Sequence, residues 1–395
     1  MIRPLLLPFL LIAGFAPKCG DSSPTAPGGS STPALNFQSI VVNAGPANNY
    51  LNGLFTSVTI CVPGQSACQT IGGVLVDTGS SGLRVLASAV TLPLPPQTDA
   101  SGAPIAECFS FLDGYTWGSV QSADIKLGGE QASGVPVQVI GAAGLPAIPP
   151  ACASSGASEN TLDTLGANGV LGVGLFREDC GAGCVGVGSS NPGLYYACPS
   201  AGCHAIAQPL ARQLQNPVWL FPTDNNGVMI QLPTVAPGGA PTATGMMVFG
   251  IGTQSDNALG TAKVRTVDAG GSIPTTYGSR SYSGSYIDSG TNGNFVLDSS
   301  TTGLPVCTQS SDFYCPPSLQ SQSATIRGVN GTTSAVTFNV GNAEALNGRF
   351  SAFSEVAGPN PGGFAWGLPF FFGRSVFTAI EGQTTPGGVG PYFAF

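Results

Sequence analysis

Two short segments each place an aspartate between an apolar strand and a glycine turn. Residues 74–82 read Val-Leu-Val-Asp-Thr-Gly-Ser-Ser-Gly, and residues 285–292 read Ser-Tyr-Ile-Asp-Ser-Gly-Thr-Asn. The chain holds only 20 Asp and Glu among its 395 residues. Two of them in matched, hydroxyl-rich turns therefore indicate a shared chemical role rather than a solvated surface.

Asp77 and Asp288 are the candidate catalytic residues. Two carboxyl groups held close together cannot both ionise cheaply, so one keeps a proton and the pair offers both an acid and a base. Such a pair can activate a water that attacks a peptide carbonyl while the protonated partner hydrogen-bonds the carbonyl oxygen. An isolated Asp-Thr-Gly is most often only a turn. The second copy of the motif favours the catalytic interpretation.

The motifs around these aspartates are repeated in order. Each Asp turn is followed by an apolar-apolar-Gly segment, Val-Leu-Gly at 170–172 and Phe-Phe-Gly at 371–373. Asp-Gly-Tyr-Thr-Trp-Gly-Ser at 113–119 lies between the first Asp and its later segment, and Met-Val-Phe-Gly-Ile-Gly at 247–252 precedes the second. The chain therefore reads as two diverged copies of one unit.

This order of motifs resembles the pepsin-like aspartic endopeptidases, and the signature at 77–82 is similar to that of uncharacterised exported bacterial proteins. The resemblance covers the chain from about residue 37 onward. It implies an all-β fold, a bilobal double β-barrel with a few short helices and pseudo-two-fold symmetry, in which each lobe lends one Asp. It also implies a polypeptide substrate, no cofactor and no metal.

The resemblance assigns roles to the residues around the two aspartates. Those expected to support the dyad are Thr78, Gly79, Ser80, Ser289, Gly290 and Thr291. Tyr115, Trp117 and Gly118 match the flap hairpin, with Tyr115 closing over the substrate. Arg84 stands where the family usually has a Trp that supports the flap Tyr, so we expect Arg84 to approach the Tyr115 hydroxyl. If it lies near the dyad, its charge could instead lower the pKa of the dyad.

Composition gives an independent indication of the fold class. The chain has 57 Gly, 33 Pro and 8% charged residues, which disfavours long helices and favours all-β structure. Its length suits two lobes, which we place at residues 37–224 and 225–395. A net charge of −8 argues against nucleic-acid binding, which needs clustered Lys and Arg. We expect a monomer.

Local patterns predict several elements. β-branched and aromatic enrichment predicts strands at 74–76, 135–140, 218–221, 246–249 and 335–340. Apolar residues four apart predict a helix over 205–215, with Pro209 in its first turn. A Gly- and Cys-rich insertion over 178–203 is expected to be a stapled loop.

The N-terminal segment predicts export. Residues 1–18 read as a signal peptide and residues 19–36 as a Ser/Pro/Gly tether. Cys19 is a candidate for lipidation, although Pro-Lys precedes it, so lipid anchorage and free secretion both stay open. The expected location is periplasmic, outer-membrane lipoprotein or secreted. No Lys or Arg lies between Lys18 and Arg84, so we expect no basic pro-segment to block the dyad.

Eleven cysteines agree with export, because ten remain for disulfides once Cys19 is set aside. Short loops predict the pairs Cys61–Cys68, Cys198–Cys203 and Cys307–Cys315. The partners of Cys108, Cys152, Cys180 and Cys184 stay open. The last two could also be spaced for a metal, but an export signal and a single His favour disulfides.

Three other functions are weighed against an endopeptidase. A Ser-His-Asp hydrolase would have to use His204, the one His in the chain. A catalytically silent pepsin-like binding module would keep the fold without turnover, and a structural envelope lipoprotein would have no site at all. Intact Asp77 and Asp288 favour the enzyme.

Overall fold

The computed structural model describes residues 35–188 and 191–395. Leu35–Phe395 form one compact unit. The predicted signal peptide, Cys19 and the tether up to residue 34 lie outside the described residues. Asn36 already belongs to the unit, since its side-chain amide donates to the Phe249 carbonyl oxygen. Within the described residues, no helix is both long and apolar enough to cross a membrane.

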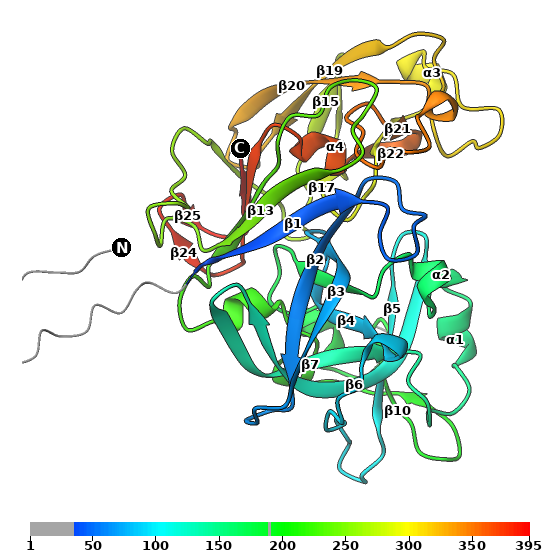
Figure 1. The fold of residues 1–395 in the computed structure, drawn as a ribbon, viewed down its shortest axis with the longest axis vertical. Helices are drawn as coiled ribbons and strands as arrows, with labels where there is room; N and C mark the ends of the chain where they lie inside the picture. Colours follow the sequence, from blue (N-terminus) through cyan, green and yellow to red (C-terminus); the bar gives the residue numbers. More distant parts are fainter. Residues whose placement is uncertain (1–34, 189–190) are drawn as a thin grey trace, which may run out of the picture. The chain divides into compact units, whose positions relative to one another are not determined.

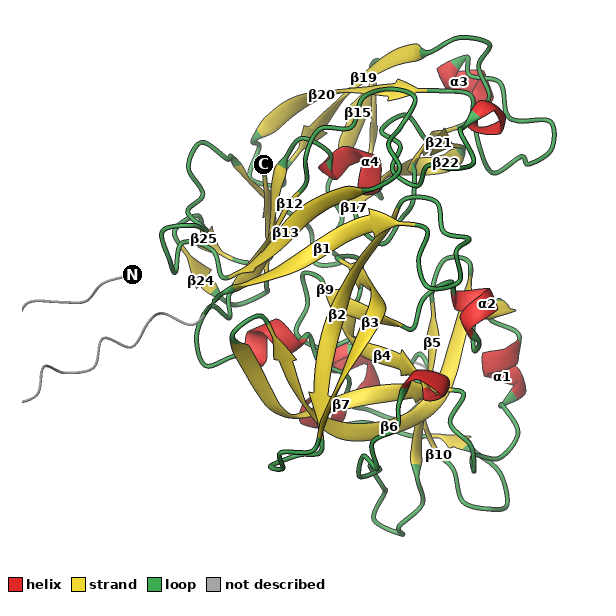
Figure 2. Cartoon of the chain, in the orientation of Figure 1, coloured by secondary structure: helices red, strands yellow, loops and turns green. Residues whose placement is uncertain are grey.

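One sheet holds most of the strands (Figures 1 and 2). In chain order its members are β1 (Phe37–Asn43), β2 (Gly53–Cys61), β3 (Cys68–Asp77), β4 (Ser81–Leu86), β5 (Ile105–Ser110), β6 (Gly114–Leu127), β7 (Glu130–Ile140), β8 (Ala157–Ser158), β9 (Gly169–Val173), β10 (Tyr195–Ala197), β11 (His204–Ala205), β12 (Gly227–Gln231), β13 (Ala243–Phe249), β14 (Val264–Thr266), β23 (Ser375–Ala379) and β26 (Tyr392–Ala394). Strands β2, β3, β9, β4, β7 and β6 pair in that order, and β6 pairs back to β2. These six therefore close a barrel.

Three smaller sheets lie in the second half of the chain. They are β16–β15–β19–β20 (Arg280–Tyr282, Thr275–Tyr277, Gln320–Arg327, Thr333–Val340), β17–β22–β18–β21 (Tyr286–Ile287, Asn360–Trp366, Asn294–Leu297, Ala357–Gly358) and β24–β25 (Thr384–Thr385, Gly388–Val389). The predicted all-β, bilobal fold is confirmed. The boundary that we predict at 224/225 lies in the turn before β12.

The helices are all short. They are α1 (Pro150–Ala153), α2 (Leu162–Leu165), α3 (Ser299–Thr302) and α4 (Leu368–Phe371), with 3-10 turns η1 (Ala87–Ala89), η2 (Gly181–Cys184), η3 (Leu210–Arg212), η4 (Pro217–Leu220) and η5 (Ala343–Ala345). The predicted helix over 205–215 is wrong, because β11 ends at Ala205 and the short turn η3 is the one helical element in this range. Pro209 precedes η3 and prevents the turn from extending toward the N-terminus. The side-chain amides of Gln208 and Gln213 also donate to backbone carbonyl oxygens of this segment, in competition with helical hydrogen bonds. The strand predicted at 218–221 is η4 instead.

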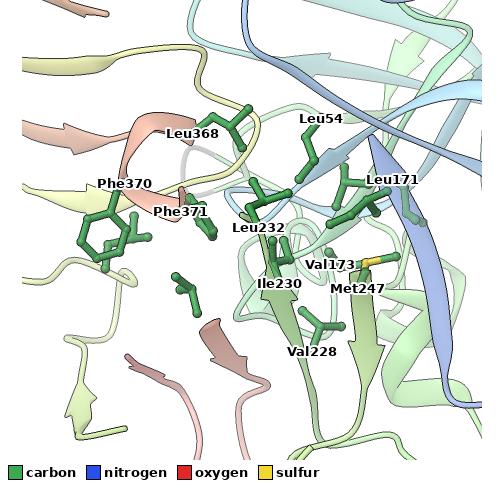
Figure 3. Packing of buried hydrophobic residues seen from close by; sticks show 14 of the residues in the cluster. Leu54, Leu171, Val173, Val228, Ile230, Leu232, Met247, Leu368, Phe370 and Phe371 are labelled. Atoms are coloured by element: carbon green, nitrogen blue, oxygen red, sulfur yellow. The ribbon is translucent and has the colours of Figure 1, made fainter. Parts of the chain in front are cut away.

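Strand β1 joins the two halves of the large sheet. It pairs with β2 through Val41–Asn43 and with β13 through Phe37–Val42, both antiparallel (Figure 1). A continuous core follows this path. Figure 3 shows Leu54, Leu171 and Val173 from the first half near Val228, Ile230, Leu232, Met247, Leu368, Phe370 and Phe371 from the second, and all ten are buried in one cluster.

Five disulfides join the described cysteines. The predicted pairs Cys61–Cys68, Cys198–Cys203 and Cys307–Cys315 are confirmed. The structure adds Cys108–Cys152 and Cys180–Cys184, so the latter two sulfurs bind each other rather than a metal. The insertion over 178–203 is stapled, and it also carries β10, which pairs with β5.

Candidate active site

The first Asp loop follows strand β3. Parallel pairing of Val74–Asp77 with Gly169–Gly172 of β9 holds Asp77 at the strand's end. The Gly79 N–H donates to one carboxylate oxygen of Asp77 at 2.7 Å, and the Ser80 hydroxyl donates to the other at 2.5 Å. The carboxylate orientation is therefore set on both oxygens.

The second Asp loop repeats this arrangement. Strand β17 runs parallel to β22 and ends just before Asp288. The Gly290 N–H donates to one oxygen of Asp288 at 2.8 Å, and the Thr291 hydroxyl donates to the other at 2.7 Å. Each of the two carboxylates thus accepts one hydrogen bond from a backbone N–H and one from a side-chain hydroxyl.

The strand beside the second loop differs from the prediction. Phe371–Gly373 was expected to correspond to Val170–Gly172, but Ala365–Trp366 of β22 lies parallel to β17. Gly367 follows it against the carbonyl oxygens of Thr291 and Gly293, where a Cβ would clash. A glycine after Trp366 is therefore required, and Phe371 lies in α4 instead.

The two loops are tied to each other across the molecule. The Ser289 N–H donates to the Thr78 hydroxyl oxygen at 2.9 Å, and the Thr78 N–H donates to the Ser289 hydroxyl oxygen at 3.2 Å. The Ser289 hydroxyl donates in turn to the Val76 carbonyl oxygen at 2.8 Å. Residues 211 positions apart are thus locked into one unit.

This lock brings the two carboxyl groups within hydrogen-bonding reach of each other. A Cβ on Gly79 would lie 2.8 Å from Asp288 Cγ, and one on Gly290 would lie 2.9 Å from an Asp77 carboxylate oxygen. Only glycine permits this approach. Burial, then the charge of Asp288, raises the pKa of Asp77 well above its usual range, although Ser80 and the Gly79 N–H act the other way. The pair therefore retains a proton at pH values where an exposed Asp has lost it.

The dyad lies at the junction of two adjoining cavities, of about 770 and 360 Å³. Asp77, Asp288, Tyr286, Phe111 and Leu112 line both. The larger one has the volume typical of a ligand site. Burial and then Asp288 raise the pKa of Tyr286 to about 12, so its hydroxyl stays protonated.

The hairpin β5–β6 carries Phe111–Asp113 at its tip, and these three residues line the larger cavity. The predicted position of Tyr115 is corrected, because this residue lines neither cavity. It is buried with Trp117, Cys108, Cys152 and Tyr196 on one face of the hairpin. Strand alternation explains this: Tyr115 and Trp117 share a face that Tyr196 covers, with 5.4 Å between the Trp117 and Tyr196 ring centroids. Gly118 pairs with Ile140 of β7, where a Cβ would collide with Val139.

Arg84 also differs from the prediction. Its guanidinium donates to Glu107 at 2.7 Å, to Asp179 at 3.0 Å and to the Ser81 carbonyl oxygen at 3.0 Å, and it stacks on the Phe109 ring. No hydrogen bond joins it to Tyr115, because Glu107 and Phe109 lie on the opposite face of the hairpin. Arg84 therefore supports the flap from beneath, through Glu107 and Phe109.

Three residues in the cleft escaped sequence reasoning. Tyr50 lines the larger cavity, and burial, followed by the charges of Asp113 and Asp77, raises the pKa of its hydroxyl. Asp113 and Glu159 line the same cavity. No motif marks Tyr50, whereas Asp113 belongs to the flap motif and was left without a role. Glu159 lies between β8 and α2, and no motif in the sequence around it indicates a place in the cleft.

Comparison with known proteins agrees with this fold. The aspartic proteinase from Irpex lacteus has a similar structure, with a TM-score of 0.51 at 16% sequence identity over 90% of this chain and 96% of that chain. At this identity the likeness establishes the fold alone. No curated protein sequence matches the chain. Residues 32–395 match the family described as "Protein of unknown function (DUF3443)". Because that match spans nearly all of the chain, the protein belongs to this family.

Proposed function

We propose that the protein is an aspartic-type endopeptidase that hydrolyses peptide bonds through Asp77 and Asp288. The observation that supports this best is the pair of equivalent carboxylates within hydrogen-bonding reach, each with one backbone and one hydroxyl donor. A structural protein has no need for two facing carboxyl groups without a cation between them, because their burial costs free energy. The adjoining cavities offer room for an extended chain on both sides of the dyad.

Each group in the site has a role in this proposal. The ionised carboxylate accepts a proton from a water held between the two Asp residues, and the protonated one donates to the scissile carbonyl oxygen. The two aspartates titrate as a pair. Thr78 and Ser289 keep the loops in register, Ser80 and Thr291 orient the outer oxygens, and Phe111–Asp113 cover the bound chain.

Turnover of a denatured protein substrate tests the proposal. Asp77→Asn and Asp288→Asn should each abolish cleavage, because either change leaves the pair without its acid–base partner. Both variants should keep the wild-type melting temperature or exceed it, since they remove a buried charge. Retained cleavage in either variant contradicts the mechanism. A wild type that binds a statine-type inhibitor without cleaving any substrate would instead identify a silent binding module.

Export is part of the same proposal. Five disulfides in the described residues are typical of an oxidising compartment and support a periplasmic or secreted location. A monomeric state is proposed from the sequence, which leaves both lipid attachment at Cys19 and free secretion open. Mass spectrometry of the mature N-terminus would distinguish an acylated Cys19 from a freely secreted chain.

A further inference from the structure

The larger cavity is strongly acidic on the side of the flap tip. Besides the dyad it is lined by Asp113, Glu159 and Asp163. Among the described residues that line the two cavities there is no Lys, Arg or His. A ligand that enters here therefore meets several carboxyl groups with no cationic side chain beside them.

Glu159 is the unusual member of this group. The residue as a whole is 9% exposed, and its backbone is fixed by the Glu159 N–H, which donates to the Tyr115 carbonyl oxygen at 2.9 Å. Among the described residues, no N–H or O–H group of the protein forms a hydrogen bond to its carboxylate, and the carboxyl group of Asp113 lies within hydrogen-bonding reach of it. Burial, and then the charge of Asp113, raises the pKa of Glu159 to about 8.

Other buried carboxylates among the described residues each accept at least one hydrogen bond from a protein donor. Asp124 accepts from the N–H groups of Gly64 and Gly134, and Glu355 accepts from the Gly238 N–H. Glu107 is paired with Arg84. Buried polar groups are nearly always hydrogen-bonded, and the Asp113–Glu159 pair faces the cavity with no protein donor beyond a proton that the two carboxyl groups can share, so it can accept hydrogen bonds from a ligand.

We propose that Asp113 and Glu159 form a subsite for a basic side chain, Lys or Arg, of the polypeptide substrate. The inference rests on the proposed endopeptidase function and names its substrate class. An ammonium or guanidinium group between the two carboxylates supplies the missing donors and cancels their mutual repulsion. Tyr50 and Leu165, which line the same cavity, can cover the apolar stem of such a side chain. Because Asp113 lies at the flap tip, a bound cation also ties the flap to the segment after β8.

Binding of uncleavable peptides tests this separately from catalysis. We suggest hexapeptides with a hydroxyethylene group in place of the central peptide bond, and with Lys or norleucine at one position at a time. Isothermal titration calorimetry at low ionic strength and near neutral pH gives Kd for each pair of peptides. At one position Lys should bind about tenfold or more tightly than norleucine, in line with charge-assisted hydrogen bonds.

Two isosteric variants locate the preference. Glu159→Gln and Asp113→Asn should each reduce it to about twofold or less, because each removes one of the two carboxyl groups that would hold the cation. Glu344→Gln is the matched control: it makes the same carboxyl-to-amide change at a residue that lines neither cavity, and its amide oxygen can still accept from the Gln309 N–H. This control should keep the full preference.

The outcomes separate the two proposals. No preference for Lys at any position, or a preference that persists in both cleft variants, overturns the basic subsite. Amide versions of the same peptides report on catalysis. If these are never cleaved while the Lys preference is present and lost in Glu159→Gln, the endopeptidase proposal fails and the subsite stands.

Discussion

At the residue scale, opposing effects set the protonation of the dyad. Burial and the neighbouring carboxylate make ionisation of Asp77 costly, whereas the Ser80 hydroxyl and the Gly79 N–H favour it. These opposing effects keep one proton on the pair while one carboxylate stays ionised. Substitution of the hydroxyl donors should therefore change the pKa of the dyad.

Removing one hydroxyl donor should shift the pH profile. Ser80→Ala deletes a group that lowers the pKa of Asp77, so the pKa rises and the alkaline limb of kcat/KM, where the protonated carboxyl loses its proton, moves to higher pH, by up to about one unit. The measurement is peptide hydrolysis across both limbs of the pH profile. Ser133→Ala, at an exposed position on β7, should leave the limb in place. An unchanged limb in Ser80→Ala would mean that the hydroxyl does not influence the titrating group.

A second charged network lies beneath the flap. Fully buried Arg84 is paired with Glu107 and Asp179, and Asp179 also accepts from the Tyr195 hydroxyl at 2.7 Å. Burial and then Glu107 raise the pKa of Asp179 well above its usual range. One cation therefore serves two carboxyl groups, and the network holds a proton as well.

Replacing this arginine should be costly. Arg84→Met leaves Glu107 and Asp179 buried without a cation, for which we expect a loss of about 3–5 kcal/mol in the free energy of unfolding. The loss should be smaller at pH 5 than at pH 8, because protonation of Asp179 relieves the repulsion. Urea unfolding at both pH values measures it. The control Arg280→Met, at an exposed position, should change stability by about 0.5 kcal/mol or less. Equal losses in both variants would contradict this account.

At the scale of elements, the flap hairpin is braced along both edges. Strand β10 pairs with β5, β8 pairs with β6, and Cys108–Cys152 joins β5 to α1. The tip residues Phe111–Asp113 lie between the two hairpin strands and outside the strand pairing. Motion of the flap is therefore expected to be confined to the tip.

The disulfide beneath the flap should contribute more stability than a local one. Cys108–Cys152 closes a loop with a separation of 44 residues and Cys180–Cys184 one of 4. Chain-entropy arguments give about 4 and about 2 kcal/mol respectively. Cys108→Ala/Cys152→Ala should also raise KM, because the flap loses its tether to α1. Urea unfolding and peptide kinetics of the two double variants test the ranking. A larger loss from the short loop would contradict it.

At the scale of the whole molecule, buried carboxyl groups make stability depend on pH in an unusual direction. Burial raises the pKa values of Asp77, Asp179 and Glu159. These groups titrate near pH 4 in the unfolded chain, so above that pH the folded state binds more protons than the unfolded state. Stability contributed in this way is complete at acid pH and is lost as pH rises through the folded pKa values. At these acid pH values the proposed dyad also keeps the single proton that its acid–base role requires.

Thermal unfolding should show this directly. We expect a higher melting temperature at pH 5 than at pH 8, with each raised carboxyl contributing at most about 1.4 kcal/mol per pH unit between its unfolded and folded pKa values. Glu159→Gln should reduce the slope between about pH 4.5 and 8, the window set by its raised pKa. Glu344→Gln should leave the slope unchanged. A melting temperature that rises from pH 5 to pH 8 would show that other groups dominate.

Local sequence by itself determined the all-β fold, the two Asp turns and three of the five disulfides. These features depend on short-range chemistry: glycine and hydroxyl residues after an apolar strand, turn formers throughout, and cysteines close enough to pair within one loop. The repeat of the Asp motif then made the juxtaposition of Asp77 and Asp288 a reasonable expectation. The failed helix over 205–215 shows the limit of periodicity when proline and glutamine side chains compete for the backbone.

Tertiary structure decided which way side chains point and which distant groups meet. The face of the hairpin occupied by Tyr115 depends on strand register, and a one-residue change in register would exchange it with the face of Phe109. Arg84 is separated in the chain from Glu107 and Asp179, so no local pattern reveals that these two carboxyl groups pair with its charge beneath the flap. The meeting of Asp113 with Glu159 likewise arises only when β8 pairs beside β6. Long-range pairing of strands, rather than local propensity, sets the electrostatics of the cleft.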